Sequence, residues 1–465
     1  MKKSNAIISI LFAGSTALAQ QKPNIVFILA DDMGWKDLGC YGNRYNETPN
    51  IDSLARSGIL FTQSYAACPV SSPTRASIMT GKYPARLQLT NFIAGNRTDP
   101  ASPILPAPWK PYLEAKEITI AELLRDAGYV TGMVGKWHLG SHDSIAPWSQ
   151  GFSYTRMIGK NGLDYYNYSI YEDSYQKEFT DNGTHYLTDK LTEYSIEFLT
   201  QNKEKPFFLY LAYSAPHVAI VPRPDKLMKY FWKYAQAEEK FNPYYAAMVE
   251  SIDDGVGQIM QFLKENNMLE NTIVIFTSDN GGLGMDELGP TPTSNRPLRK
   301  WKGHVYEGGI RVPALISWQG KIKPGRISDE YFSSVDYFTT LCEMAGIKKL
   351  PVNIDGISIL PALFGTGRID AGRPLFWHYP HFSNQMGRPA GAVRLGDYKL
   401  VENYETGELE LYNLKEDISE SRNLSSSMNQ KTAELHKLLV NWRKSINASM
   451  PVPNPEFNKQ EVSAR

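Results

Sequence analysis

The chain has 465 residues, which is enough for one large domain and a smaller second one. Its 49 lysines and arginines are balanced by 49 aspartates and glutamates, and a formal charge of zero argues against a nucleic-acid-binding protein, which usually carries a basic excess. An anionic ligand is compatible with this balance, because a few local cations do not change the total.

The first residues have the pattern of an export signal. Lys2 and Lys3 precede the apolar run AIISILFAG, and the small residues ALA at 17–19 precede Gln20. This pattern predicts a signal peptide over residues 1–19. The apolar run is too short to span a bilayer and no other stretch is long enough, so we expect an exported protein without a transmembrane segment.

Four apolar runs further along the chain each stop at polar residues, with helical patterns such as TIAELLRDAG between them. Continuous apolar strands that alternate with amphipathic helices predict an α/β fold, with a large, mostly parallel sheet covered by helices on both faces. Ligand sites in such sheets form at the carboxyl ends of the strands. The runs are NIVFILADD (24–32), YVTGMVGKWH (129–138), PFFLYLAYSAPH (206–217) and NTIVIFTSDNGG (271–282).

The pattern changes after about residue 370. Alternating residues with turns at Gly396-Asp397 and Thr406-Gly407 predict an antiparallel meander, and a helix follows it. We therefore predict a main domain over 20–370 and a smaller C-terminal α+β subdomain over 371–465. The predicted apolar stripe of that helix consists of Leu435, Leu438, Leu439 and Trp442.

Carboxyl-rich pairs end two of the apolar runs, Asp31-Asp32 and Asp279-Asn280. One such pair is more often a helix cap than a ligand site. Two separate pairs indicate a cation between them, because adjacent carboxylates repel one another, and hard oxygen ligands favour Ca²⁺ or Mg²⁺. Zinc is less favoured, because no histidine–carboxylate ligand group stands at these strand ends.

Three further polar positions follow the strands. Lys136 and His138 are two residues apart, so an extended backbone would point both to one face and Trp137 to the other. A lone lysine is usually a solvated charge, but at the end of an apolar strand it is expected to face a cleft. His217, in SAPHVA, is equally compatible with an ordinary loop histidine and with a functional one.

The segment RPLRKWKGHVYEGGIRVP (296–313) is rich in cations. A run of charges usually forms a solvated face. Here Lys302 is followed by Gly303, by Glu307 and by the turn at Gly308-Gly309, a layout suited to holding one cation at a fixed point.

The stretch CPVSSPTRASIMTGKYPAR (68–86) places Ser71, Pro73 and Arg75 at the start of a helical pattern. Proline suits the first turn of a helix, where its missing N–H is no loss. Ser71 would lie at the helix N-terminus, where free N–H groups favour an anion, and Arg75 on the same face one turn later. The segment predicts an oxyanion cradle that carries a nucleophile.

This combination of motifs resembles the sulfatase family. SSPTR followed by ASIMTGKYPAR resembles the signature C/S-x-P-x-R, whose first residue is converted to formylglycine (3-oxoalanine), and the resemblance extends from about residue 22 to LYNLKEDISESRNL near the C-terminus. It implies an alkaline-phosphatase-like fold whose C-terminal subdomain completes the substrate pocket. The other matching motifs, in the family's order, are ADDMGWKDLGCYG, GKWHLG, SDNGG and KGHVYEGGIRVP.

The resemblance also implies roles for single residues. Arg75 and His138 would support the formylglycine hydrate, and His217 would help to protonate the leaving oxygen. Lys136 and Lys302 would neutralise the sulfate oxygens; Trp301 stands where the family has glycine, and Lys302 is preferred to Lys300 because it directly precedes Gly303. The implied ligands of Ca²⁺, with Mg²⁺ as the alternative ion, are Asp31, Asp32, Asp279, Asn280 and modified Ser71.

Position 71 is serine rather than cysteine, which resembles the bacterial branch matured by an anaerobic radical-SAM enzyme. That maturase is the expected protein partner, and the expected compartment is the bacterial periplasm, the medium or the cell surface. Unmodified Ser71 would leave the enzyme nearly inactive. Cys68 lies outside the motif and receives no role.

The expected activity is hydrolysis of sulfate esters of carbohydrates, on galactose or N-acetylhexosamine units of host or algal glycans. The alternatives are a phosphatase or phosphodiesterase of the same superfamily and a catalytically silent glycan-binding relative. Segments 162–175 and 376–382 are predicted to form the pocket rim. His304, His378 and His381 are candidate substrate contacts, and structural roles for them are equally expected.

Overall fold

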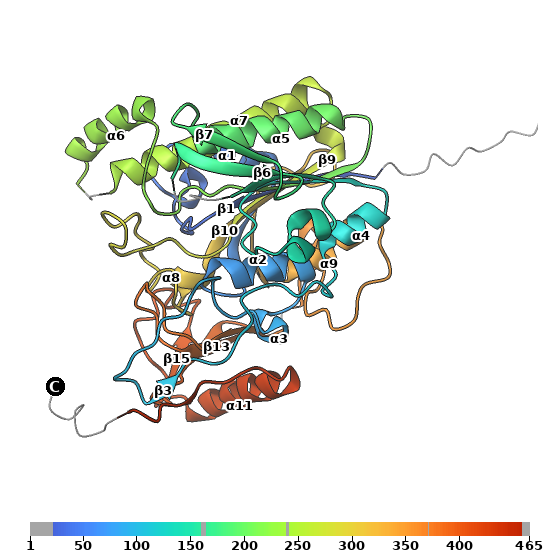
Figure 1. Ribbon diagram of the computed structural model, residues 1–465. Helices are drawn as coiled ribbons and strands as arrows, with labels where there is room; N and C mark the ends of the chain where they lie inside the picture. The colour runs from blue at the N-terminus through green and yellow to red at the C-terminus, as the bar shows by residue number, and fades with distance from the viewer. Residues whose placement is uncertain (1–21, 160–163, 239–240, 371, 458–465) are drawn as a thin grey trace, which may run out of the picture.

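A ten-stranded sheet forms the centre of the protein (Figure 1). The computed structural model describes residues 22–159, 164–238, 241–370 and 372–457. The strand order is β11-β2-β10-β9-β1-β8-β4-β5-β6-β7, and only β10 and β6 run opposite to their neighbours. The strands are β1 (Asn24–Ala30), β2 (Ile59–Tyr65), β4 (Val130–Gly135), β5 (Tyr154–Ile158), β6 (Asn167–Glu172), β7 (Glu178–Asn182), β8 (Phe207–Ala212), β9 (Thr272–Ser278), β10 (Arg311–Trp318) and β11 (Arg326–Ser333).

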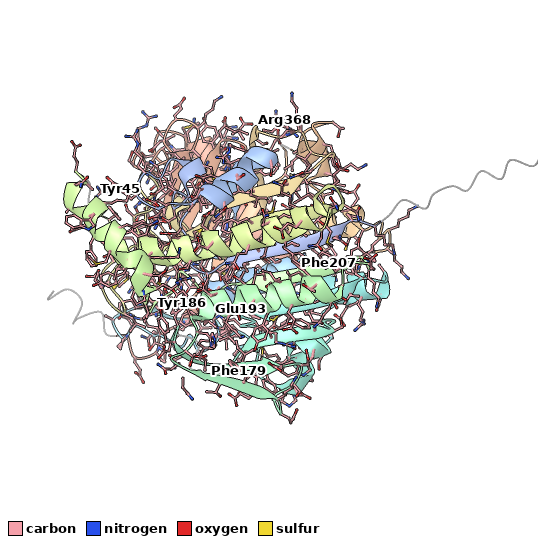
Figure 2. The ribbon with its side chains drawn as sticks, turned by 90° about the horizontal axis from the view of Figure 1, so that it is seen from above. Tyr45, Phe179, Tyr186, Glu193, Phe207 and Arg368 are labelled. Carbon is pink, nitrogen blue, oxygen red and sulfur yellow. The ribbon has the colours of Figure 1, made fainter. Side chains whose placement is uncertain are left out.

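Helices cover both faces of this sheet, as the apolar strands predict (Figures 1 and 2). Side chains of β1 alternate between two buried clusters: Phe27 packs with the helices of one face, and Val26 with those of the other. The first face carries α2 (Ser71–Thr80), α4 (Ile120–Asp126) and α9 (Asp336–Met344), and the second carries α1 (Pro49–Ser57), α5 (Leu187–Gln201) and α7 (Pro243–Glu265).

A second, antiparallel sheet with the order β12-β13-β14-β15 follows the main sheet in the chain. Helix α11 (Asn429–Ser445) packs on it through Leu435 and Leu439, as the sequence predicts. The expected fold class is thus confirmed, whereas the boundary at 370/371 stays a prediction. The strands are β12 (Leu375–Tyr379), β13 (Ala390–Leu395), β14 (Tyr398–Asn403) and β15 (Leu409–Asn413), and a small separate sheet joins β3 (Ile104–Leu105) to β16 (Val452–Pro453).

The four predicted apolar runs become β1, β4, β8 and β9, which are adjacent and parallel in the order β9-β1-β8-β4. Their carboxyl ends therefore meet at one edge of the sheet. Within the described ranges, no helix is both long and apolar enough to cross a membrane; the predicted signal peptide, 1–19, lies outside these ranges. The remaining α-helices are α3 (Pro84–Leu87), α6 (Pro224–Gln236), α8 (Glu307–Ile310) and α10 (Leu360–Phe364).

Candidate active site

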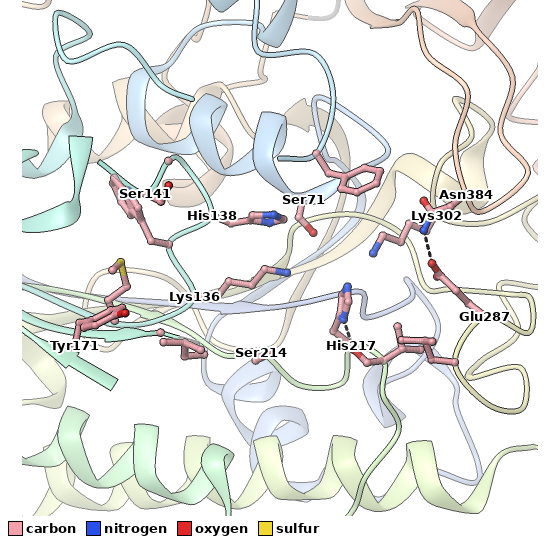
Figure 3. Close-up of a pocket in the computed structure, with 18 of the residues that line it drawn as sticks. Ser71, Lys136, His138, Ser141, Tyr171, Ser214, His217, Glu287, Lys302 and Asn384 are labelled. Carbon is pink, nitrogen blue, oxygen red and sulfur yellow. Dashed lines mark hydrogen bonds between the residues drawn. The ribbon is translucent and has the colours of Figure 1, made fainter. Parts of the chain in front are cut away.

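A cavity of about 780 Å³ opens at this edge of the sheet, and Ser71 lies in its wall (Figure 3). Residues from both sheets' connecting loops surround it. The structure brings five predicted functional side chains to this single cavity, although they are up to 231 positions apart in the chain: Ser71, Lys136, His138, His217 and Lys302.

Helix α2 begins at Ser71, as predicted, after Val70 in an extended conformation. Pro73 lies in the first turn, where no hydrogen bond is lost. Ser71 is 2% exposed; its Oγ lies 3.1 Å from Asp31 Oδ1, to which it donates, and 3.3 Å from Asn280 Oδ1. The helix N-terminus thus holds this hydroxyl between the ends of β1 and β9.

The four polar residues at those strand ends form one buried cluster. The backbone N–H of Asp32 donates to Asp279 Oδ1 over 3.1 Å, and Asn280 Nδ2 donates to Asp32 Oδ1 over 2.8 Å. The backbone of Asp32 has φ 66°, in the left-handed region. Carboxylate and amide oxygens from Asp31, Asp32, Asp279 and Asn280 therefore converge beside Ser71.

Three cations, Arg75, Lys136 and Lys302, balance the charges of the three carboxylates. Lys302 Nζ lies 2.7 Å from Asp32 Oδ2, and Lys136 Nζ pairs with Asp31. Burial alone would raise the pKa of Asp31, but Lys136 and the other cations around it hold that pKa well below its usual range. Burial likewise disfavours the charge on Lys302, yet Asp32 raises its pKa. Lys300 lies over the Trp301 ring instead, 5.5 Å from its centroid.

Arg75 is fully buried and does not line the cavity. Its Nε and Nη2 donate to Asp279 Oδ2 over 3.0 and 2.7 Å, and its Nη1 donates to the backbone oxygen of Lys136 over 2.9 Å. The guanidinium therefore holds a carboxylate and the end of β4 in place. Its predicted contact with the hydrate of residue 71 stays a prediction.

The backbone at His138 differs from the expected extended form, because its φ is 57°. Strand β4 ends at Gly135, so the alternation rule no longer applies to Lys136 and His138. Both side chains nevertheless line the cavity, and so does Trp137, which was expected to point away. Burial, together with Lys136 and Arg75, lowers the pKa of His138, so this ring is neutral near pH 7.

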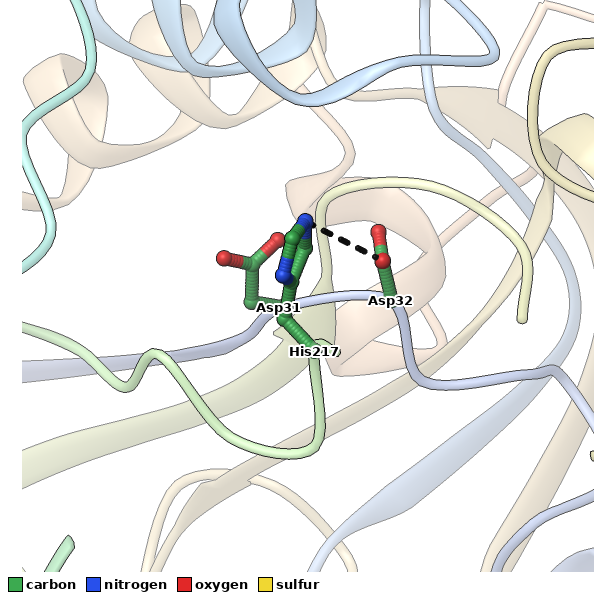
Figure 4. A group of neighbouring side chains, drawn as sticks. All are labelled: Asp31, Asp32 and His217. Atoms are coloured by element: carbon green, nitrogen blue, oxygen red, sulfur yellow. Dashed lines mark ion pairs between the residues drawn. The ribbon is translucent and has the colours of Figure 1, made fainter. Parts of the chain in front are cut away.

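His217 comes from the loop after β8 and lies beside the acidic cluster (Figure 4). Its Nε2 is 3.5 Å from Asp32 Oδ2, and burial and Lys302 lower its pKa. Asp31, Asp32 and His217 each offer one ligand atom, all within 4.8 Å of one another. The expectation that no histidine accompanies these carboxylates is therefore wrong, because β8 is the neighbour of β1 and ends at the same edge.

The donor set fits a divalent cation. Three buried carboxylates, the Asn280 amide oxygen and the Ser71 position supply hard oxygen atoms, the chemistry that Ca²⁺ prefers.

The outer wall of the cavity combines residues of a predicted rim segment with residues that the sequence did not indicate. Glu287 is held by Gln385 Nε2, 3.1 and 3.2 Å from its two carboxylate oxygens, and by the Asn384 amide. Tyr171 and Tyr175, from the predicted rim segment 162–175, form an apolar wall with ring centroids 5.0 Å apart. Glu287 lies in a loop rich in glycine and proline, which gives no signal, and Asn384 lies two residues beyond the other predicted rim segment.

The three candidate substrate histidines do not line this cavity. His378 interacts through both ring nitrogens with the chain itself, at Tyr404 Oη and Ser449 O. His381 bonds to Thr90, and His304 lies 3.1 Å from the backbone oxygen of Trp301. All three are buried in structural positions, so the geometry gives their predicted substrate role no support.

Comparisons with known proteins agree with this geometry. The sulfatase family model matches residues 23–347, and the model for the N-sulphoglucosamine sulphohydrolase C-terminal region matches 300–445. A sulfatase of Formosa agariphila is 33% identical over 92% of this chain and 90% of its own length. N-acetylgalactosamine-6-sulfatase of Canis lupus familiaris is 35% identical over 82% of this chain and 72% of its own length. The crystal structure of Ps i-CgsB in complex with k-i-k-neocarrahexaose has TM-score 0.79 and 30% identity over 91% of this chain and 93% of that one.

Proposed function

The chain belongs to the sulfatase family and is a sulfuric ester hydrolase; from this premise we propose that it removes sulfate from carbohydrates by means of a formylglycine at position 71. The proposed substrates are O-sulfated galactose or N-acetylhexosamine units of host or algal glycans. Relatives named for N-acetylgalactosamine 6-sulfate and crystallised with a neocarrahexaose support this class. The observation that carries the proposal is Ser71 Oγ, held at a helix N-terminus in the cavity wall beside Asp31 and Asn280.

The proposed modification explains why a serine occupies this position. A plain serine would retain sulfate as a second stable ester. When present, the hydrated aldehyde would supply two hydroxyls on one carbon, and so both a nucleophile for sulfur and a way to release sulfate by re-forming the aldehyde. An anaerobic radical-SAM maturase is the proposed partner for this conversion.

The side chains around Ser71 take complementary roles in this proposal. Lys136 and Lys302 line the cavity on the side of the carboxylates and would pair with the non-bridging sulfate oxygens. His217 is proposed to deliver the proton to the leaving sugar oxygen, a step worth roughly 10²–10⁴-fold. His138, which lies beside Ser71 in Figure 3, is proposed to accept a proton from the hydrate.

Ca²⁺ is the proposed ion, held by Asp31, Asp32, Asp279, Asn280 and residue 71, with Mg²⁺ as the alternative. It would supply positive charge beside the developing negative charge on the reacting group. Because His217 offers nitrogen near two of these carboxylates, elemental analysis of the purified protein is required to separate Ca²⁺ from a transition metal. Zinc at one equivalent would contradict this part of the proposal.

The protein is proposed to act after export to the periplasm, the medium or the cell surface. This proposal rests on residues 1–19 of the sequence alone. Fractionation of cells that produce the full chain, with N-terminal sequencing of the recovered protein, tests it. A mature protein beginning near Gln20 outside the cytoplasm is the expected result, and an uncleaved cytoplasmic protein would contradict it.

Turnover by protein co-produced with the maturase tests the activity. Sulfate release from 4-nitrophenyl sulfate and from a panel of mono-sulfated saccharides is expected, with far slower release of phosphate from 4-nitrophenyl phosphate. Preferential phosphate release would favour the phosphatase alternative, and no release from any ester by modified protein would favour a silent glycan-binding relative. Mass spectrometry should find peptide 68–86 two hydrogen atoms lighter than its sequence requires, apart from hydration.

Ser71→Ala is expected to reduce sulfate release to background while the protein still folds, because the substitution removes the only atom that the modification can use. The matched control is Ser72→Ala on the same turn of α2, whose hydroxyl accepts from the Ile93 N–H over 3.0 Å and does not line the cavity. That variant should retain turnover. Activity that survives in the first variant, or disappears only in the second, would refute the assignment of residue 71.

A further inference from the structure

A second cavity, of about 1050 Å³, is larger than the catalytic one. The loop 283–296 separates the two. Its residues Glu287 and Leu288 line the catalytic cavity, whereas Asp286 and Pro290 line the second one. A molecule in the second cavity is therefore next to the loop that forms the outer wall of the catalytic site.

Aromatic side chains from three segments line this second cavity. Tyr45 stacks on Phe241 with ring centroids 4.3 Å apart and an interplanar angle of 17°, and Figure 2 shows Tyr45 beside α6. Phe231 and Tyr244 remain 38% and 39% exposed at the same cavity. Partly exposed aromatic rings can pack against the apolar faces of a ligand, and the tyrosine hydroxyl can form hydrogen bonds with its hydroxyl groups.

Three cations of the same cavity have no ion-pair partner within the part of the chain that the structure describes. Lys36, Arg44 and Arg296 form no salt bridge with any described residue. The neighbouring helix α6 is different, since Lys229 and Lys233 both pair with Glu47. The carboxylates that also line the cavity, Glu238 and Asp286, are in no salt bridge with the three cations among the described residues. The three cations exceed the two carboxylates of the lining by one charge, and cations that are not held by a carboxylate of the protein can attract an anionic group.

We propose that this second cavity is a non-catalytic binding site for a sulfated sugar unit of a glycan chain. The aromatic rings would contact the faces of the sugar, and Lys36, Arg44 and Arg296 would neutralise its sulfate. The ligand class rests on the proposed function, but the site itself involves none of the residues of the reaction. Its consequence is that sulfated polymers bind more tightly than monosaccharides that fill the catalytic cavity alone.

Affinity electrophoresis in gels that contain ι-carrageenan or chondroitin 6-sulfate tests the proposal. The protein carries Ser71→Ala, so that turnover does not consume the polymer. We expect at least one of these polymers to retard the protein and its desulfated form to retard it less. The additional triple substitution Lys36→Ala, Arg44→Ala and Arg296→Ala should raise the apparent dissociation constant roughly tenfold, as three partly exposed charge contacts imply.

The matched control removes three other exposed lysines, Lys321, Lys323 and Lys348, which form no ion pair with any residue that the structure describes, and it should leave retardation unchanged. With Ser71 intact and modified, the first triple variant should hydrolyse 4-nitrophenyl sulfate as fast as the parent. The proposal is overturned if neither polymer retards the Ser71→Ala protein, or if the two triple variants lose affinity equally. Failure of the proposed function would appear instead as absent turnover in a protein that still binds the polymer.

Discussion

Arg75 is a single side chain whose donors are all directed at the protein itself and not at the cavity. It is buried, and its donors are used by Asp279 and by the backbone of Lys136. Arg75→Met would leave Asp279 buried and without its partner. We expect the free energy of unfolding to fall by about 3–5 kcal/mol, the cost of breaking one side of a buried ion pair.

Urea unfolding in the presence of a chelator measures this cost. The matched control is Arg125→Met, which removes a pair of similar length, 3.0 Å to Asp126, from the protein surface. That substitution should cost less than about 1 kcal/mol. Equal losses in the two variants would show that Arg75 does not stabilise the acidic cluster.

Lys302 and Lys300 are two residues apart, and the structure separates their roles. Lys302 is buried against Asp32, whereas Lys300 lies over the Trp301 ring outside the cavity. Lys302→Ala should lower kcat for 4-nitrophenyl sulfate by about 10²–10³-fold, because one fixed positive charge at the reacting group is lost. Lys300→Ala should be close to the parent. The reverse order of effects would show that the assignment of the cation is wrong.

At the scale of elements, α8 packs so closely on the loop 299–304 that it fixes the position of Lys302. A Cβ atom on Gly309 would lie 2.0 Å from the backbone oxygen of His304. Gly309→Ala must therefore move the loop, at a cost of about 1–3 kcal/mol in the free energy of unfolding. Turnover should fall by more than this stability loss explains, because a shift of about 1 Å in a catalytic group can cost about 10²-fold.

Kinetics with 4-nitrophenyl sulfate at a temperature well below the unfolding transition separate the two effects of Gly309→Ala. Gly367→Ala provides the control, because the nearest atom to its added methyl group would be Pro361 Cβ at 3.4 Å. This control should keep parental turnover. Full turnover in the Gly309 variant would mean that α8 does not position the cation.

The elements also show which features the sequence can predict. Asp31, Asp279 and His217 follow apolar strands, and parallel strands must end at one edge, so their convergence follows from the pattern. The turn at His138 was not predicted, because its positive φ is imposed beyond the end of β4 rather than by local preference. Glu287 was also missed, because loops that meet only in the folded chain bring it to Gln385.

At the scale of the whole molecule, one buried charge cluster joins the main sheet to the C-terminal sheet. Lys399 Nζ of β14 lies 2.9 Å from Glu307 Oε1 of α8 and 2.9 Å from Glu420 Oε1. The backbone N–H of Glu307 also donates to Glu420 over 2.7 Å. Nothing in the sequence marks Glu420 for this role, because its partners are 21 and 113 positions away. The substrate cavity needs loops from both sheets, so this cluster supports it indirectly.

Glu420 makes the stability of the protein depend on pH. Burial, which Lys399 only partly offsets, raises the pKa of Glu420, and repulsion from Glu307 raises it further. The folded state therefore holds this proton more tightly than the unfolded chain, whose glutamates titrate at about 4.3. The contribution of this proton to the free energy of unfolding is complete below about pH 4.3, the unfolded-chain pKa, and is lost as pH rises through the folded-state pKa of Glu420.

Glu420→Gln removes the titrating carboxyl group, so no proton is lost at this position as pH rises. The amide oxygen of the glutamine can still accept from the Glu307 N–H. We therefore expect the variant to gain stability relative to the parent between pH 5 and pH 8, as measured by urea unfolding at both values. Other titrating groups are present in both proteins and cancel in this difference. Glu416→Gln, which changes an exposed glutamate of the same loop, should follow the parent at both pH values. If the stability of Glu420→Gln changes with pH as that of the parent does, Glu420 is ionised in the folded protein across this range. Glu307 and Glu420 would then both be charged and would share Lys399 as their common partner.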